Sequence, residues 1–258
     1  MKPVYGPVAS WRLGRSLGID PICRLEKTCS FDCIYCQLGK TKKKTLKREI
    51  FLTVEEIINE FKSCWKKIEN RVDVITFSGT GEPTLALNLG DIANELKDLS
   101  DKPLAILTNS SLLFKRDVRK DLMALDIVVA KLDAPNQEVL ERVNKPVKAL
   151  KFDKIMEGLK KFRENFDGKF AIQIMFIKEN LNYLDDIIER VRELNPDEVQ
   201  INTPLRPSPV EPLSREEISR ITKKFSEFKR VLSVYNSKKL EVTPLDINEM
   251  KLRRKVEQ

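Results

Sequence analysis

The sequence predicts an α/β protein built around a parallel sheet. From about residue 50 onward, apolar runs of strand length alternate with segments of helical periodicity. Single helices separate consecutive strands, which implies parallel pairing with right-handed crossovers. Polar residues directly follow several of the apolar runs. We therefore expect an α/β barrel, complete or partial, or a doubly wound open sheet, with functional residues at the carboxyl ends of the strands.

The predicted helices begin at clear capping signals. The first covers residues 53–70 and opens on a capping box formed by Thr53 and Glu56. The last opens on a second capping box, Ser214 and Glu217, and is expected to run to about Leu232. The helices between them are predicted at residues 91–99, 117–125, 152–166 and 184–194.

The predicted strands are apolar runs that end in polar residues. They cover residues 72–79, 103–109, 126–134, 169–177 and 198–203, and the last of these is the last clear strand. The polar candidates at their carboxyl ends are Ser78 to Glu82, Thr108, Asn109, Ser110, Lys131, Asp133, Asn202 and Thr203. Lys131 and Asp133 lie two positions apart, so they share one side of their strand.

The composition indicates one soluble globular unit. The chain has 258 residues, 41% hydrophobic and 33% charged, which suits a single α/β domain over residues 1–258. No apolar run is long enough to span a membrane, and the first residues lack an apolar signal region, so we expect a cytoplasmic protein. The net charge of +8 permits a polyanionic partner, although such a charge is more often a solvated Lys/Glu-rich surface.

Cysteines carry the clearest chemical signal. Cys29, Cys33 and Cys36 are clustered in a chain that has five cysteines and no histidine. Clustered thiolates select zinc or an iron–sulfur cluster. A structural zinc site needs four ligands, with Cys23 as the candidate fourth, but zinc knuckles usually use two paired-ligand turns and this is one loop. In an iron–sulfur cubane held by three cysteines, the fourth iron stays open to another ligand.

The spacing C-x3-C-x2-C, with Tyr35 just before the last cysteine, resembles the signature of the radical S-adenosylmethionine (SAM) superfamily. This resemblance implies a [4Fe–4S] cluster on the three cysteines, with the amino and carboxylate groups of SAM on the open iron. Reductive cleavage of SAM then supplies a 5′-deoxyadenosyl radical that abstracts hydrogen from a substrate. The family's fold is a partial (β/α)6 TIM-like barrel, which here implies a core at about 20–205, a short N-terminal extension and a helical C-terminal extension at 206–258.

A second motif extends the resemblance. The stretch SGTGEPTL at residues 78–85 is similar to the family's glycine–glutamate motif, which implies that Ser78, Gly79, Gly81 and Glu82 hold the amino group of SAM. Residues 5–20, 131–144 and 200–207 resemble stand-alone Fe–S oxidoreductases related to the wybutosine-synthesis proteins. Many of those relatives carry extra cysteines for an auxiliary cluster, which this chain lacks. Cys23 and Cys64 are expected to be core or free thiols.

The remaining candidates concern SAM and the substrate. Because they end a strand at the expected catalytic rim, Lys131 and Asp133 are expected to contact SAM, with a plain ion pair as the alternative. Asn109, Ser110 and Asn202 are expected to contact adenosine or substrate, with ordinary strand-end turn residues as the alternative. An external one-electron reductant of the flavodoxin or ferredoxin type is implied. The resemblance does not determine the substrate, and both RNA and a protein are candidates. The basic segment 40–48 is expected to be either an RNA contact or a solvated loop. The alternative function is a non-catalytic iron–sulfur electron-transfer or metal-binding module without a SAM site.

Overall fold

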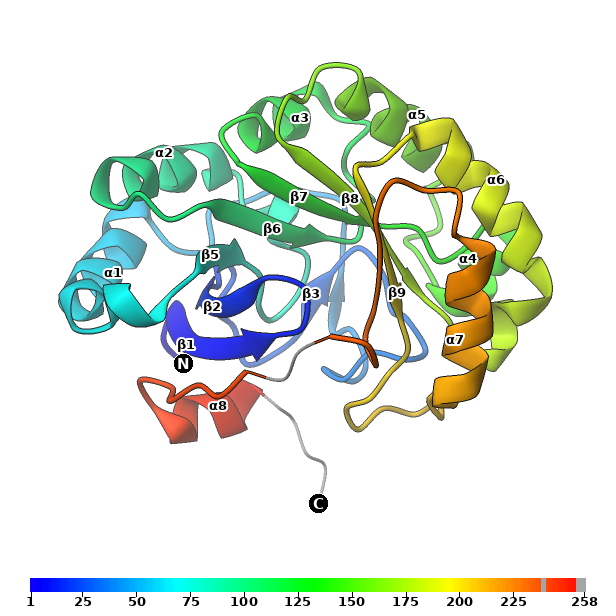
Figure 1. The fold of residues 1–258 in the computed structure, drawn as a ribbon. Helices are drawn as coiled ribbons and strands as arrows, with labels where there is room; N and C mark the ends of the chain where they lie inside the picture. Colours follow the sequence, from blue (N-terminus) through cyan, green and yellow to red (C-terminus); the bar gives the residue numbers. More distant parts are fainter. Residues whose placement is uncertain (238–239, 254–258) are drawn as a thin grey trace.

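The structure, a computed structural model, describes residues 1–237 and 240–253. Its centre is an eight-stranded sheet that curls into a half-barrel, with helices along its outer side (Figure 1). The strand order is β1-β2-β5-β6-β7-β8-β9-β10, and every neighbouring pair is parallel except β1 with β2. The predicted partial barrel is therefore confirmed, because β1 and β10 lie at opposite ends of the order and leave the barrel open.

The strands of this sheet lie close to the expected positions in the middle of the chain. They are β1 Val4–Ser10, β2 Gly14–Ile19, β5 Val74–Phe77, β6 Leu104–Thr108, β7 Ile127–Lys131, β8 Lys169–Met175, β9 Glu198–Asn202 and β10 Val231–Ser233. The sequence prediction omitted the N-terminal hairpin of β1 and β2. Strand β2 of this hairpin pairs in parallel with β5. The first strand of the parallel part of the sheet is therefore β2, which precedes the cysteine loop in the sequence.

The C-terminal part of the sheet corrects one expectation. Helix α7, Arg215–Lys224, opens on the predicted capping box of Ser214 and Glu217 but ends well before Leu232. Residues 231–233 instead form β10, whose Val231 pairs with Val199 of β9. The expected helix is wrong there because a short apolar segment does not show from sequence alone whether it will pair with a distant strand.

The other helices follow the predicted alternation. They are α1 Val54–Ile68, α2 Leu89–Leu99, α3 Arg116–Leu122, α4 Gln137–Val143, α5 Phe152–Arg163, α6 Leu184–Leu194 and α8 Ile247–Arg253, with short 3₁₀ turns at Glu69–Arg71, Pro83–Leu85 and Lys178–Tyr183. The capping box of Thr53 and Glu56 is confirmed at α1. Helix α4 was not expected. A small ribbon pairs β3, Thr28–Cys29, with β4, Lys43–Lys44.

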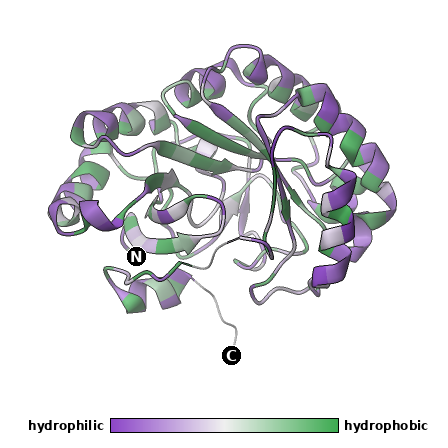
Figure 2. Ribbon diagram, in the orientation of Figure 1, coloured by the Kyte–Doolittle hydropathy of each residue, from purple (hydrophilic) through white to green (hydrophobic). Residues whose placement is uncertain are grey.

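The core lies between the sheet and the helices. Figure 2 shows apolar strands, and helices whose outward surfaces are hydrophilic. Large side chains such as Phe61, Phe77, Phe162 and Phe170 are fully buried there. Burial of each stabilises the fold by about 1.5–3 kcal/mol, which makes this layer the main source of stability. In the described part of the chain, no helix is both long and apolar enough to cross a membrane.

Candidate active site

A cavity of about 530 Å³ occupies the open half-barrel. Its lining comes from the β1–β2 hairpin, the cysteine loop, the carboxyl ends of several strands and the C-terminal helix. Among the predicted site residues, it includes Tyr35, Cys36, Ser78, Gly79 and Asn202. Parallel strands direct their carboxyl ends to one rim of the sheet, which is why residues far apart in sequence meet there.

The three motif cysteines lie on one loop at this rim. Cys29 ends β3 and is buried, while Cys33 and Cys36 are partly buried in the turn that follows. The Cys36 amide donates to the Cys33 carbonyl at 3.1 Å, and the Thr45 amide donates to the Cys29 carbonyl at 3.0 Å. All three thiols are free of disulfides. These backbone bonds fix the turns of the loop, and Cys36 borders the cavity.

Two asparagine amides donate to the thiol sulfurs. Asn109 Nδ2 lies 3.4 Å from Cys29 Sγ, and Asn144 Nδ2 lies 3.4 Å from Cys33 Sγ. Burial raises the pKa of the Cys29 thiol to about 12, and the nearby Glu82 adds to this shift. A bound metal would replace the thiol proton, and N–H donors to sulfur stabilise the thiolate that remains. Three thiols on one loop, two of them with such donors, suit an iron–sulfur cluster by their chemistry, although within the described residues they are not gathered into a ready metal-binding group.

Cys23 has different surroundings from this triad. Its sulfur lies 3.9 Å from Arg253 Nη2, and burial raises the pKa of its thiol to about 11. Cys64 sits on α1, half-buried against the core, where its sulfur donates to the Phe61 carbonyl. The structure therefore places Cys23 and Cys64 outside the loop that carries Cys29, Cys33 and Cys36.

Tyr35 and Asp133 form a buried network behind the cysteine loop. The Tyr35 hydroxyl donates to Asp133 Oδ2, which also accepts from Asn144 Nδ2 at 2.8 Å. Lys131 Nζ lies 3.4 Å from the same oxygen and 4.6 Å from the centre of the Tyr35 ring. Burial and the Asp133 charge raise the pKa of Tyr35 well above its usual value, so the hydroxyl stays protonated as a donor. Lys131 and Asp133 therefore lie on the same side of the chain, and in this structure they form an ion pair with each other.

Glu82 is buried and anchors the loop that follows β6. Its Oε1 accepts from the Thr84 amide at 3.1 Å and from the Thr84 and Thr108 hydroxyls at 2.6 and 2.7 Å, while Oε2 accepts from the Asn109 amide at 2.7 Å. Burial raises the pKa of Glu82, and these donors oppose the shift. A carboxylate accepts about four hydrogen bonds, so Glu82 joins the glycine turn to the Asn109 that supports Cys29.

The glycines of the turn permit close packing of the chain. A Cβ atom on Gly81 would lie 1.7 Å from the Thr28 carbonyl oxygen, and one on Gly79 would lie 2.1 Å from the Asp20 carboxylate carbon. Both positions therefore exclude side chains because the turn lies directly on the segment that leads into the cysteine loop. Gly79 also lines the cavity, so the backbone there is accessible to a ligand.

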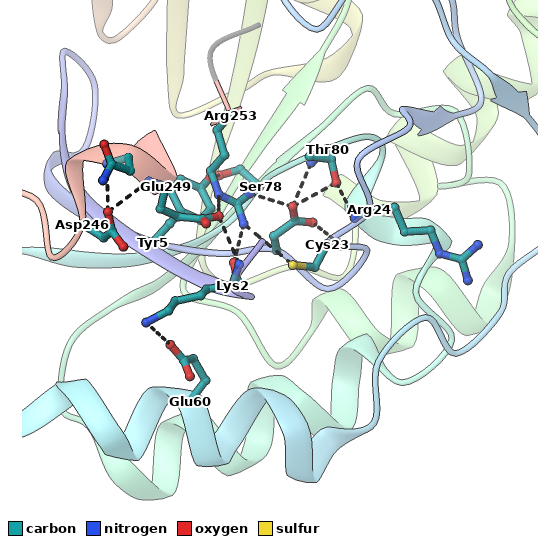
Figure 3. Close-up of polar contacts among 12 residues, drawn as sticks. Lys2, Tyr5, Cys23, Arg24, Glu60, Ser78, Thr80, Asp246, Glu249 and Arg253 are labelled. Atoms are coloured by element: carbon teal, nitrogen blue, oxygen red, sulfur yellow. Dashed lines mark hydrogen bonds and ion pairs between the residues drawn. The ribbon is translucent and has the colours of Figure 1, made fainter. Parts of the chain in front are cut away.

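A cluster that the sequence did not suggest supports the same turn (Figure 3). Asp20 Oδ2 accepts from the Thr80 amide at 3.1 Å, the Thr80 hydroxyl at 3.0 Å and Arg253 Nη1 at 2.7 Å. Arg253 comes from α8 and also pairs with Glu249 at 3.0 Å. The Tyr5 hydroxyl and the Ser78 hydroxyl are 2.7 Å apart. The only sequence signal was that Asp20 follows an apolar stretch.

The basic segment 40–48, expected to be an RNA contact or a solvated loop, is only partly exposed. Lys42 is exposed, and Lys43 and Lys44 are exposed on β4, where Lys43 Nζ pairs with Glu49 at 2.7 Å. The expectation is wrong for Arg48, which is buried and pairs with Asp117 and Asp121 of α3. Its guanidinium also donates to two backbone carbonyls, so it braces the fold.

A half-barrel of parallel strands with a three-cysteine loop at its carboxyl rim defines a class of iron–sulfur proteins. Residues 27–191 match the family model described as the radical SAM superfamily. This chain belongs to the radical SAM superfamily, whose members carry a [4Fe–4S] cluster and use SAM.

Two curated relatives show the extent of the likeness. A UPF0026 protein of Methanocaldococcus jannaschii is 39% identical over 90% of this chain and 73% of its own length. A chain named GTPase Obg from Brachyspira hyodysenteriae is 41% identical over 87% of this chain, but this chain spans only 33% of that protein.

Solved structures show the same fold at low identity. A radical SAM methyltransferase from Sphaerobacter thermophilus has a TM-score of 0.62 at 14% identity, covering 84% of this chain and 66% of that one. An archaeal TYW1 has a TM-score of 0.54 at 13% identity, covering 83% of this chain and 72% of that one. The resemblance to the wybutosine-related group therefore holds at the level of the fold.

Proposed function

We propose that this protein is a radical SAM oxidoreductase that abstracts hydrogen from its substrate inside the half-barrel cavity. The observation that carries the proposal is the cysteine loop itself. Three free cysteines lie on one loop, two of their sulfurs accept from asparagine amides, and the third borders a cavity of about 530 Å³. When bound, the cluster and SAM supply the 5′-deoxyadenosyl radical.

The protein's own residues would hold and orient these groups. Cys29, Cys33 and Cys36 would hold the cluster, and Asn109 and Asn144 would donate to its sulfur ligands. The turn Ser78–Thr80 borders the cavity, which suits a contact with the amino acid part of SAM. Tyr35 and Asn202 border the same space.

Three predicted SAM contacts, Glu82, Lys131 and Asp133, are not among the described residues that line the cavity. Glu82 already has four protein donors, and Lys131 and Asp133 pair with each other. A direct contact with SAM would require each to exchange a protein partner for the ligand. Their roles as SAM ligands remain predictions, and each also positions residues of the cysteine loop.

Release of 5′-deoxyadenosine tests the proposal. Anaerobically reconstituted protein, mixed with dithionite and SAM, should release it, and a flavodoxin or ferredoxin type of reductant should replace dithionite. Cys33→Ser should lose the cluster and the product, whereas the matched control Cys64→Ser should retain both. A full cluster without any 5′-deoxyadenosine would instead favour a non-catalytic electron-transfer module.

A further inference from the structure

The cavity is lined by basic side chains and by no acidic one. Of the described residues that border it, Arg12, Arg206 and Arg253 are charged basic groups, and none is an aspartate or glutamate. The positive charge of Arg253 is balanced outside the cavity lining by Asp20 and Glu249, at 2.7 and 3.0 Å. No carboxylate among the described lining residues neutralises Arg12. The charge of Arg12 therefore makes the electrostatic potential inside the cavity more positive.

Arg12 lacks partners for its donors. Within residues 1–237 and 240–253, its guanidinium forms no ion pair or hydrogen bond, and its buried Nε is unsatisfied. Its guanidinium carbon lies 4.8 Å from the centre of the Trp11 ring. Burial lowers the pKa of Arg12 to about 10; the like charge of Arg206, which borders the same cavity, contributes, and the charge of Glu198 opposes the shift. Arg12 remains protonated at neutral pH, and a buried donor without an acceptor is costly.

Gln173 is a second unsatisfied donor on the same cavity. It lies on β8 with a side chain that is 6% exposed, and its buried Nε2 has no hydrogen-bond partner in the described chain. It borders the cavity together with Arg12. Both residues border the same cavity, and an acceptor group bound there would give such donors a partner.

Arg206 connects this space to the cysteine loop. Its Nη1 donates to Gln37 Oε1 at 3.1 Å, and Gln37 directly follows Cys36. A group that binds Arg206 is therefore held next to the loop on which the radical chemistry depends.

We propose that Arg12 and Arg206, with Gln173, bind an anionic group of the substrate, a carboxylate or a phosphate. Arginine presents planar paired donors that match both groups. SAM carries a carboxylate of its own, but the family resemblance assigns that group to the open iron, so the anion proposed here belongs to a second molecule. The assignment rests on the proposed function, because it takes this cavity as the place where the substrate reacts.

Anion binding can be measured without SAM or reductant. The chain has two tryptophans, Trp11 on the cavity and Trp65 in the core, so a Trp65→Phe background leaves Trp11 as the fluorescent reporter. Reconstituted holoprotein should be titrated with pyrophosphate and separately with succinate, at ionic strength fixed with chloride. We expect saturable fluorescence changes, and Arg12→Gln or Arg206→Gln should weaken binding roughly tenfold or more.

Matched variants identify the source of any weakening. Gln173→Leu should weaken binding less than the arginine changes, and the exposed Arg116→Gln on α3 should leave it unchanged. Arg206 lies in a loop outside the core, so its variant tests the proposal even if Arg12→Gln folds poorly. Tighter pyrophosphate binding identifies a phosphate, and tighter succinate binding identifies a carboxylate.

Two results would overturn the proposal: absence of saturable binding of either anion, or equal affinities in wild type and both arginine variants. Failure of the proposed function is a separate result, because it is scored by 5′-deoxyadenosine release.

Discussion

Arg253 Nη1 lies 2.7 Å from Asp20 Oδ2, and both side chains are buried. This contact ties the C-terminal helix α8 to the segment just before the cysteine loop (Figure 3). Because Asp20 also accepts from Thr80, one carboxylate holds the C-terminal helix and the glycine turn together. The C-terminal helix thus completes the wall of the active-site cavity.

Replacing Arg253 should destabilise the protein. Removal of one partner leaves a buried carboxylate without its cation, which typically costs about 3–5 kcal/mol. We expect Arg253→Met to lower the free energy of unfolding by about this amount in urea. Lys251→Met, an exposed change on the same helix, is the control and should change it little. Equal stability of the two variants would show that the buried pair does not anchor α8.

The asparagine donors should tune the cluster. Hydrogen bonds to ligand sulfurs favour the more negative, reduced state and so raise the reduction potential. Asn144→Leu removes the donor 3.4 Å from Cys33 Sγ, so the midpoint potential should become more negative. Potentiometric titration followed by electron paramagnetic resonance measures this. Asn248→Leu, an exposed change on α8, should leave the potential where it is in wild type.

The role of Glu82 can be tested by binding. Loss of charge-assisted hydrogen bonds costs about 1.5–3 kcal/mol, so Glu82→Ala should weaken SAM binding roughly 10- to 150-fold. The three cysteines stay in place, so iron should still bind, and the iron content is measured because Glu82 also holds the Asn109 that supports Cys29. Equilibrium dialysis with labelled SAM, alongside an iron assay, separates the two effects. An unchanged dissociation constant would reject any part for Glu82 in holding SAM.

The exposed lysines of the basic segment should matter only for an RNA substrate. Each lysine that neutralises a phosphate releases counterions, so affinity for bulk tRNA should fall log-linearly with salt. Changing Lys42, Lys43 and Lys44 together to Ala should flatten that slope by about 0.7–0.9 for each phosphate that the variant no longer neutralises. Filter binding over a salt series measures it, with 5′-deoxyadenosine release as the control for an intact site. If wild type and the triple variant show equal salt slopes, these lysines are a solvated surface that does not contact RNA.

The sequence by itself determined the features that depend on neighbouring residues. The capping boxes of α1 and α7 and the alternation of strands with helices are local patterns, and the structure confirms each. The cysteine spacing is also a local pattern, and it is what points to the radical SAM family. The polar strand ends lie at one rim because parallel strands share one direction.

Only the tertiary structure decided the features that join distant segments. The pairing of β2 with β5 and of β10 with β9, the four donors on Glu82 and the Arg253–Asp20 contact all depend on positions that the chain brings together by folding. Asp20 and Arg253 are 233 positions apart, and neither belongs to a local motif. Such contacts follow from packing around one sheet, where a residue's partner is set by three-dimensional position and leaves no periodic signal in the sequence.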